Sequence, residues 1–316
     1  MAGNTYNEQG HRGKSGSTEE VHRESVARNF VDFIKLEHTV FDLPFIVSGS
    51  FIAAGTFPGL RIIVLVLLAG TLARAAAMGT NRIMGRKYDQ TNPRKSKWGL
   101  VNGNISTKNA LLFVALMMAL FEIDTYFING FVLMLSPIVL SLFIIDPFLK
   151  RITPWRHFFM GVTIGVGVMA GYLAVIPSFP SSPAIYILVL ATGIWIAGFD
   201  MIYTIPDIEH DRRNNLKTVM TRYGVNNGMK ISSMTHAVTL GLFTLLLIYI
   251  NSYYYAVALI IIYILIIYQH IIVDPEKPGS IRVSFLNSNS FIGMIFLASL
   301  ILSQYFPLIL LPAGSL

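Results

Sequence analysis

A series of long apolar segments, each bounded by turn residues or by charge, limits the folds open to this chain. Nine such segments recur along the 316 residues, at about 40–57, 60–81, 109–123, 130–146, 157–176, 184–205, 232–250, 253–273 and 291–312. A helix that crosses a membrane needs about 20 predominantly apolar residues. The composition, 53% hydrophobic and only 13% charged, lies far from that of a globular protein. We therefore predict an all-α, polytopic membrane protein with nine transmembrane helices.

The basic residues indicate which ends of these spans face the cytoplasm. Arg61 and Arg74 lie in or beside the first two spans, and every other Lys and Arg lies in the N-terminal region or after spans two, four, six and eight. Lys and Arg accumulate in the cytoplasmic loops of membrane proteins. The pattern predicts a cytoplasmic N-terminus and an external C-terminus in the cytoplasmic membrane. It also accounts for the net charge of +7 without a nucleic-acid partner.

The chain divides into a polar N-terminal tail and one membrane domain. Residues 1–25 are rich in Gly, Ser, Asn and charge, so we predict a disordered tail, with a single transmembrane domain over 26–316. Val26, Phe30, Phe33 and Ile34 follow a helical spacing, which indicates an interfacial helix before the first span. The absence of cysteine excludes disulfides, thiol nucleophiles and thiolate metal sites.

A run of charge from Asp200 to Arg213 directly follows the sixth apolar segment. If this run is helical, Asp200, Asp207 and Asp211 lie within roughly 20° of one line along the helix surface. Charged groups at a membrane span are costly, so three carboxylates on one face indicate a functional site, most simply one for a divalent cation. We also expect Pro206 to kink the helix beside this site. An acidic interfacial loop without a ligand is the alternative.

The end of the second span is the other place where polar groups continue an apolar helix. It carries Arg74, Asn81, Asp89 and Arg94 and has the same orientation as the end of span six, four spans later. This relation suggests two weakly repeated halves with one site between them. Carboxylates that hold Mg²⁺, ringed by Arg and Lys, suit a polyphosphate, and in a membrane an isoprenoid diphosphate is the simplest choice.

These two segments resemble the paired signatures of the UbiA superfamily of intramembrane prenyltransferases. The likeness covers about residues 30–312 and is closest to the branch that prenylates aromatic acids for ubiquinone or menaquinone. Further matching segments lie at 34–45, 92–94, 150–157 and 211–217. The resemblance implies nine helices around a central cavity with a cytoplasmic polar cap. It also implies Mg²⁺-dependent transfer of a polyprenyl group from its diphosphate to an aromatic acid such as 4-hydroxybenzoate.

The resemblance assigns roles to residues of both signatures. The catalytic and metal-binding residues that it implies are Asn81, Asp89, Asp200, Asp207 and Asp211. The substrate-binding residues that it implies are Arg74, Arg94, Lys150, Arg151 and Tyr203. Arg74 would bind the acceptor's carboxylate or the diphosphate, with a structural ion pair as the alternative. Lys150 and Arg151 would close over the diphosphate, with anchoring at the membrane surface as the alternative.

One position departs from the first signature of the family. Gly85 stands where the family usually has a metal-binding aspartate, on the same helical face as Asn81 and Asp89. Only those two residues would then hold a Mg²⁺ ion from this helix. Two alternatives to prenyl transfer to an aromatic acid therefore stay open. The chain could be a degenerate, non-catalytic member of the family, or it could transfer the prenyl group to another acceptor, a glycerol-phosphate lipid or a haem.

Overall fold

The computed structural model describes residues 33–34, 39–284 and 288–310, and its regular elements in these ranges are helices. One helix of 16 residues or more lies at each of the nine predicted spans. In chain order they are α2 (Thr39–Ala54), α3 (Leu60–Asp89), α5 (Thr107–Ile128), α6 (Gly130–Ile152), α7 (Arg156–Leu173), α8 (Pro183–Tyr203), α10 (Val219–Ile250), α11 (Tyr253–Ile271) and α13 (Asn289–Tyr305). The predicted tail and most of the predicted interfacial helix lie outside the described residues.

The lengths and compositions of these helices confirm an all-helical polytopic membrane fold. Within the described residues, six helices are long and apolar enough to cross a membrane: α3, α5, α6, α8, α10 and α11. The helices α2 and α13 are apolar but shorter. That all nine helices cross the membrane stays a prediction.

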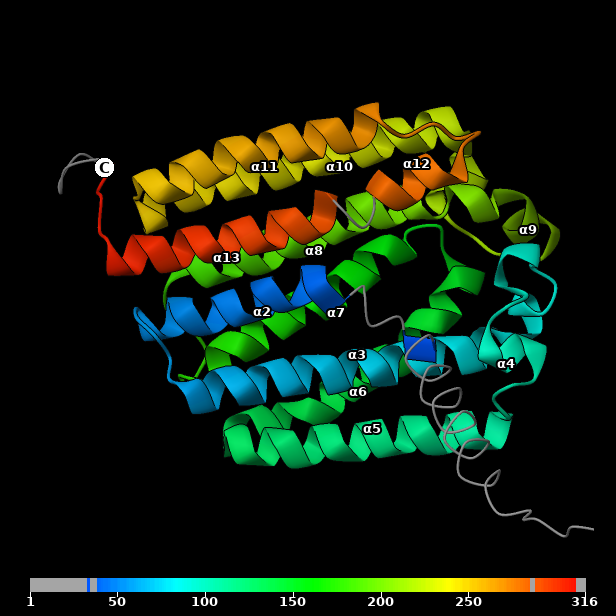
Figure 1. Ribbon diagram of the computed structural model, residues 1–316, viewed down its shortest axis with the longest axis horizontal. Helices are drawn as coiled ribbons and strands as arrows, with labels where there is room; N and C mark the ends of the chain where they lie inside the picture. The colour runs from blue at the N-terminus through cyan, green and yellow to red at the C-terminus, as the bar shows by residue number, and fades with distance from the viewer. Residues whose placement is uncertain (1–32, 35–38, 285–287, 311–316) are drawn as a thin grey trace, which may run out of the picture.

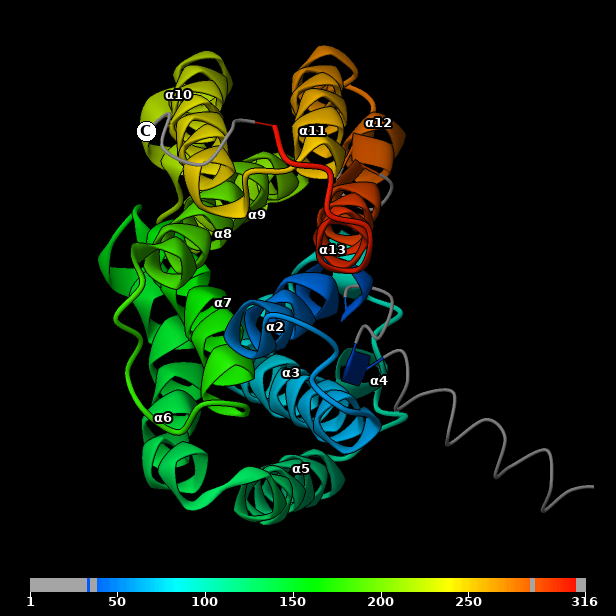
Figure 2. The same ribbon diagram turned by 90° about the vertical axis from the view of Figure 1, so that its left-hand side faces the viewer.

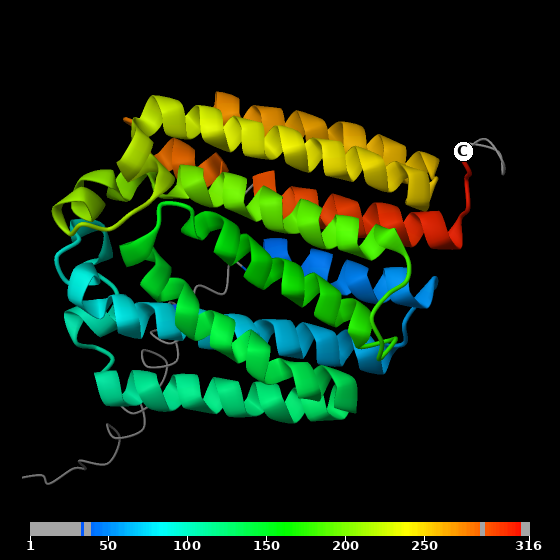
Figure 3. The ribbon, with the colours of Figure 1, turned by 180° about the vertical axis from the view of Figure 1, so that it is seen from behind.

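Successive long helices alternate in direction and run side by side (Figure 1). The short elements gather at the end of the bundle opposite the last described residues, and the view from behind shows the same arrangement (Figure 3). These short elements are η2 (Pro93–Lys95), α4 (Gly99–Asn102), η3 (Ile205–Asp207), α9 (Ile208–Arg213) and α12 (Pro278–Val283). The polar segments that follow spans two and six therefore lie at the same end of the molecule.

Seen end-on, α7 lies beside α8 and α2 lies beside α13, so the first helices of the chain pack directly on the last ones (Figure 2). An aromatic cluster lies at this contact, because Phe45 of α2 lies 5.0 Å from Trp195 of α8 and 5.1 Å from Phe296 of α13, measured between ring centres. All three side chains are fully buried. Each such contact contributes dispersion and favourable ring geometry beyond the area that it buries.

Glycines bring α7 unusually close to its two neighbours. A Cβ atom added at Gly161 would lie only 2.0 Å from the backbone oxygen of Gly193 in α8, and one added at Gly171 would lie 1.9 Å from that of Ile46 in α2. Small residues at such contacts let helix backbones approach closely. The van der Waals packing that results favours the association of helices in lipid. The close approach holds the polar first turn of α7 against the end of α8.

The helix that carries Asp200 does not continue to Asp211. It ends at Tyr203, and the chain then forms the 3₁₀ turn η3 and the separate short helix α9. The run from Asp200 to Asp211 is therefore not one continuous helix, and the condition for three carboxylates on one helical face is not met. The predicted interruption of the helix at Pro206 is confirmed. Pro206 explains why α8 ends here, since proline has no N–H for a helical hydrogen bond and its ring clashes with the preceding turn.

Candidate active site

The turn that follows α3 meets the turn that follows α8 at Asp207. Asn92 donates a hydrogen bond from Nδ2 to Asp207 Oδ1 at 2.8 Å, and Arg94 forms an ion pair with Oδ2 of the same carboxylate. The Asp207 side chain is buried. The two polar segments singled out in the sequence are thus in direct contact.

The charges around Asp207 keep its carboxylate ionised. Burial alone would raise the pKa of Asp207. The positive charges of Arg94, Lys95 and Lys150, with the hydrogen bond from Asn92, outweigh burial and hold the pKa below its ordinary value. Arg94 and Lys95 belong to η2, and Lys150 lies in the last turn of α6. Cations from two separate elements therefore converge on this carboxylate.

Two more buried carboxylates at this end each pair with a lysine. Asp89, the last residue of α3, lies 2.7 Å from Lys95 Nζ, and Asp211 of α9 lies 2.9 Å from Lys150 Nζ. The three carboxylates and their three cations form one cluster, which we call the polar network: Asp89, Arg94, Lys95, Lys150, Asp207 and Asp211.

Asp200 belongs to a second set of contacts, made with α7. Its carboxylate lies 2.6 Å from His157 Nδ1 and 3.4 Å from Arg156 Nη1. Arg156 also lies 3.4 Å from Asp146 of α6. Asp146, Arg156 and His157 were not among the site residues predicted from the sequence. The sequence feature that indicates them is the charged stretch 146–157, which leads directly into the fifth apolar segment.

The predicted site residues do not all join the polar network. Five of them belong to it, and Tyr203 lies beside it, with the guanidinium carbon of Arg94 5.6 Å from the centre of its ring. Arg151 is exposed, and its guanidinium contacts the backbone oxygen of Met84 at 3.4 Å. That contact places Arg151 against the side of α3, where no carboxylate of the network is its partner.

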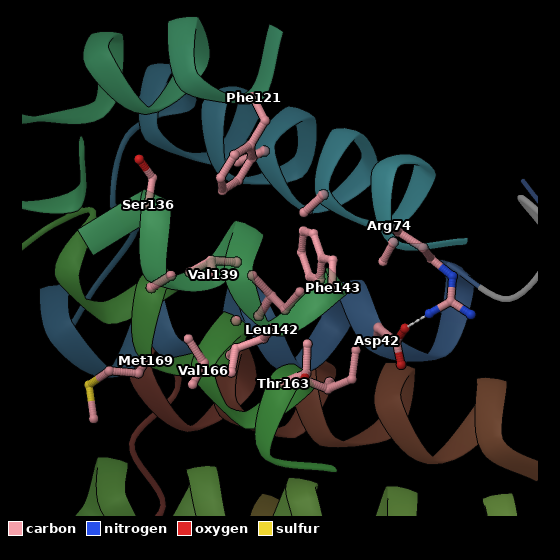
Figure 4. Close-up of a pocket in the computed structure, with 18 of the residues that line it drawn as sticks. Asp42, Arg74, Phe121, Ser136, Val139, Leu142, Phe143, Thr163, Val166 and Met169 are labelled. Atoms are coloured by element: carbon pink, nitrogen blue, oxygen red, sulfur yellow. Dashed lines mark hydrogen bonds and ion pairs between the residues drawn. The ribbon is translucent and has the colours of Figure 1, made fainter. Parts of the chain in front are cut away.

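A cavity of about 350 Å³ lies among α2, α3, α5, α6 and α7. Its lining extends along α3 from Asn81 to Val66, a rise of about 22 Å, and most of the lining side chains are apolar. Figure 4 shows Asp42 and Arg74 at one end and Ser136 toward the other. This cavity thus lies among five of the nine long helices, and a central cavity surrounded by all nine stays a prediction.

The polar end of this cavity adjoins the polar network. Asp146 and Arg156 both line the cavity, and Asp146 lies one helical turn before Lys150 on α6. A ligand with a charged head and an apolar tail could therefore place its head in the polar network and its tail in the cavity. Arg74 and Asn81, both predicted site residues, line the cavity itself.

The polar network offers donors of the kind that bind Mg²⁺, which takes oxygen ligands from carboxylates. Within the ranges that the structure describes, no three His, Cys, Asp or Glu side chains are grouped to hold one ion. Each carboxylate of the network instead faces a lysine or an arginine. A magnesium–diphosphate complex fits these residues in charge, because the ion can take the carboxylates and the phosphate oxygens can take the freed cations.

Gly85 lies directly beside the carboxylate that α3 contributes. A Cβ atom at this position would lie 3.3 Å from Asp89 Oδ2. An aspartate here would therefore share a site with Asp89, as the resemblance implies for its relatives. With glycine at this position, α3 supplies one carboxylate to the polar network.

Comparison with known proteins agrees with this geometry. The UbiA prenyltransferase family model matches residues 43–300. The chain is 30% identical to the 4-hydroxybenzoate octaprenyltransferase of Pasteurella multocida over 253 residues, which cover 79% of this chain and 86% of that protein. The apo structure of a UbiA homolog from Aeropyrum pernix K1 is similar, with 29% identity, a TM-score of 0.76, and coverage of 85% of this chain and 98% of that one.

A second solved structure shares the fold. It is a UbiA homolog from Archaeoglobus fulgidus bound to GPP and Mg²⁺, with a TM-score of 0.69, 21% identity, and coverage of 86% of this chain and 99% of that one. The family model spans most of the helical domain, from α2 into α13. The chain therefore belongs to the UbiA prenyltransferase family and is a multi-pass membrane prenyltransferase.

Proposed function

We propose that this prenyltransferase transfers a polyprenyl group from a polyprenyl diphosphate to an aromatic acid, 4-hydroxybenzoate or a close relative, in ubiquinone or menaquinone biosynthesis. The observation that carries the proposal is the polar network at the end of an apolar cavity. Relatives named 4-hydroxybenzoate octaprenyltransferase support the choice of acceptor, and the homolog bound to GPP and Mg²⁺ supports the donor and the ion.

The polar network would bind the diphosphate. Arg94, Lys95 and Lys150 would contact the phosphate oxygens, since charge-assisted hydrogen bonds to phosphate are among the strongest polar contacts. Mg²⁺ would be held by Asp89, Asp207 and Asp211, with Asp200 and Asn81 as further oxygen donors of the site. When bound there, the ion supplies positive charge that stabilises the departing diphosphate.

The cavity would hold the prenyl chain and keep water from the reacting carbon. Its lining is mostly apolar, so an allylic cation formed at the polar end is shielded from hydrolysis. Tyr203 ends α8 beside the polar network, and the electron-rich face of its ring would stabilise such a cation. Arg74 on the cavity wall would lie next to the bound acceptor.

We also propose that the polar end of the bundle faces the cytoplasm, because the basic loops lie there. The chain has no cysteine, so single cysteines can report the orientation. The single substitution Lys97→Cys should give a protein that reacts with a membrane-impermeant maleimide only in inside-out vesicles. The single substitution Phe179→Cys, in the loop before α8, should give a protein that reacts only in right-side-out vesicles. The opposite labelling pattern would reverse the orientation.

The deciding experiment is mass spectrometry of the products made by the purified full chain. It should be supplied with Mg²⁺, a panel of prenyl diphosphates, and a panel of acceptors that contains aromatic acids, a glycerol-phosphate lipid and a haem. We expect a prenylated aromatic acid and release of diphosphate that stops when the ion is chelated. A product formed only from a glycerol-phosphate lipid or a haem would show that the acceptor is not an aromatic acid. No Mg²⁺-dependent release of diphosphate with any donor and acceptor would refute the proposal and favour a degenerate member.

A further inference from the structure

The charged side chains that line the cavity are already matched with one another. There are four of them, two arginines and two aspartates: Asp42, Arg74, Asp146 and Arg156. Arg74 pairs with Asp42, and Arg156 lies 3.4 Å from both Asp146 and Asp200. The lining therefore has no excess positive charge with which to bind an anionic acceptor.

Arg74 is held by two neighbouring residues of α2. Its Nη1 pairs with Asp42 Oδ2, and its guanidinium carbon lies 5.3 Å from the centre of the Phe41 ring. The side chains of Arg74 and Asp42 are only 11% and 4% exposed. The pair lies at one end of the cavity (Figure 4). A ligand in the cavity therefore meets Arg74 and its counter-ion together, as a unit without net charge.

The stability of the fold does not explain why a carboxylate lies at the cavity wall beside Arg74. A buried ion pair contributes to stability only when its remaining donors and acceptors are also satisfied. Asp42 Oδ1 and Arg74 Nε are buried and make no hydrogen bond with any part of the chain that the structure describes. An apolar residue in place of Asp42 would leave a free guanidinium on the cavity wall, which is a strong site for a carboxylate.

We infer that Asp42 determines which acceptors this enzyme takes. By neutralising Arg74, Asp42 weakens selection for the negative charge of an aromatic acid. The enzyme then accepts an uncharged phenol of the same size about as well as the acid. The inference rests on the proposed function and deepens it, because it defines the acceptor class as phenols whose carboxylate is not required.

The test compares two acceptors of nearly equal shape, 4-hydroxybenzoate and 4-hydroxybenzamide. The full chain, purified in detergent, is given geranyl diphosphate and Mg²⁺, and kcat/KM is measured for each acceptor. For the wild type we expect the ratio of acid to amide to lie within about threefold of one. For Asp42→Ala we expect the ratio to rise about tenfold or more, because Arg74 becomes free to bind the carboxylate.

Two further variants separate charge from shape and from general damage. Asp42→Asn keeps the size of the side chain and removes its charge, so the ratio should rise as it does in Asp42→Ala. Glu209→Ala removes an exposed carboxylate of α9 and should leave the ratio unchanged. If neither Asp42 variant folds, as judged by gel filtration, the wild-type ratio alone decides.

The outcomes for this inference and for the proposed function are distinct. A wild type that prefers the acid by more than about tenfold overturns the role of Asp42. The role of Asp42 is also overturned if both Asp42 variants have the wild-type ratio of kcat/KM for the acid to kcat/KM for the amide. The proposed function survives either result, since prenyl transfer to the acid still occurs. Failure of transfer to every aromatic acceptor would instead refute the proposed function.

Discussion

His157 Nδ1 lies 2.6 Å from the carboxylate of Asp200, and this contact joins the start of α7 to the end of α8. The other ring nitrogen, Nε2, accepts a hydrogen bond from the backbone N–H of Val219 at 3.4 Å. A neutral imidazole has one donor and one acceptor, so these contacts assign the proton to Nδ1, which donates to Asp200. His157 thus fixes the orientation of a carboxylate at the edge of the proposed site.

Removal of this donor should weaken catalysis. We expect His157→Ala to lower kcat/KM by about 10- to 100-fold, because a hydrogen bond to a charged group contributes about 1.5–3 kcal/mol. His157→Asn places an amide N–H near the position of Nδ1 and should recover part of the loss. Initial rates of diphosphate release measure both effects. Wild-type rates in His157→Ala would show that this contact has no part in catalysis.

The two carboxylates that follow α8 should be essential. We expect Asp207→Ala and Asp211→Ala each to abolish turnover, because each carboxylate is buried, faces a cation of the polar network and would bind Mg²⁺. The matched control is Glu209→Ala, since Glu209 lies on α9 between them with its side chain 88% exposed. It should keep full activity. Normal rates in both aspartate variants, measured on folded protein, would remove them from the site.

The depressed pKa of Asp207 predicts a pH dependence of stability. The ionised form is favoured in the folded state, so Asp207 stabilises the protein above its unfolded pKa of about 3.9 and loses this effect as the pH falls through the lower, folded pKa. The difference in thermal unfolding temperature between wild type and Asp207→Asn should therefore be largest near neutral pH and shrink below about pH 4. A difference that grows with acidity would contradict the charge arrangement.

The sequence located the helices well because each long helix contains an apolar core. Polar residues extend two of the helices beyond their apolar segments. The expected polar continuation of span two is present, since α3 runs on to Asp89. Span seven was expected from residue 232, yet α10 begins at Val219 and has a break in its helical backbone at Gly224. Hydropathy detects only the part of a helix that suits lipid. Polar turns beyond it form when they can pair with other elements, as Asp89 does with Lys95.

The sequence predicted most carboxylates that the structure gathers at the candidate site, but not their partners. Asp89, Asp200, Asp207 and Asp211 stand out because charge beside an apolar span is costly. Their partners depend on which distant segments approach, and the spacing of residues along the chain does not contain that information. Arg156 is an example, since it meets Asp200 only because glycines bring α7 close to α8.

Restoration of the missing aspartate should strengthen Mg²⁺ binding. In Gly85→Asp the new Cβ atom would lie 3.3 Å from Asp89 Oδ2, so the carboxylate that it carries would be beside that of Asp89 and the two can share one ion. We expect the Mg²⁺ concentration that gives half-maximal activity to fall by about threefold or more. Gly85→Asn is the matched control, since it adds similar bulk without charge. An unchanged or higher Mg²⁺ requirement in Gly85→Asp would show that the ion does not bind beside Asp89.

The close contact between α7 and α8 should tolerate no added atom at Gly161. In Gly161→Ala the new Cβ would lie 2.0 Å from the backbone oxygen of Gly193, so the helices must separate. Overpacking of this kind costs about 1–3 kcal/mol. Because Gly161 lies about one turn after His157, the shift should also lower activity by disturbing the contact with Asp200.

Gly241 provides the control for this prediction. It lies within α10, and an added Cβ there meets no described atom within 4 Å. Gly241→Ala should therefore unfold at the wild-type temperature or slightly above it, since alanine favours a helix by about 0.5–1 kcal/mol over glycine. Thermal unfolding in one detergent, with initial rates beside it, compares the two variants. Equal stability of both would mean that the α7–α8 interface is looser than its backbone contacts indicate.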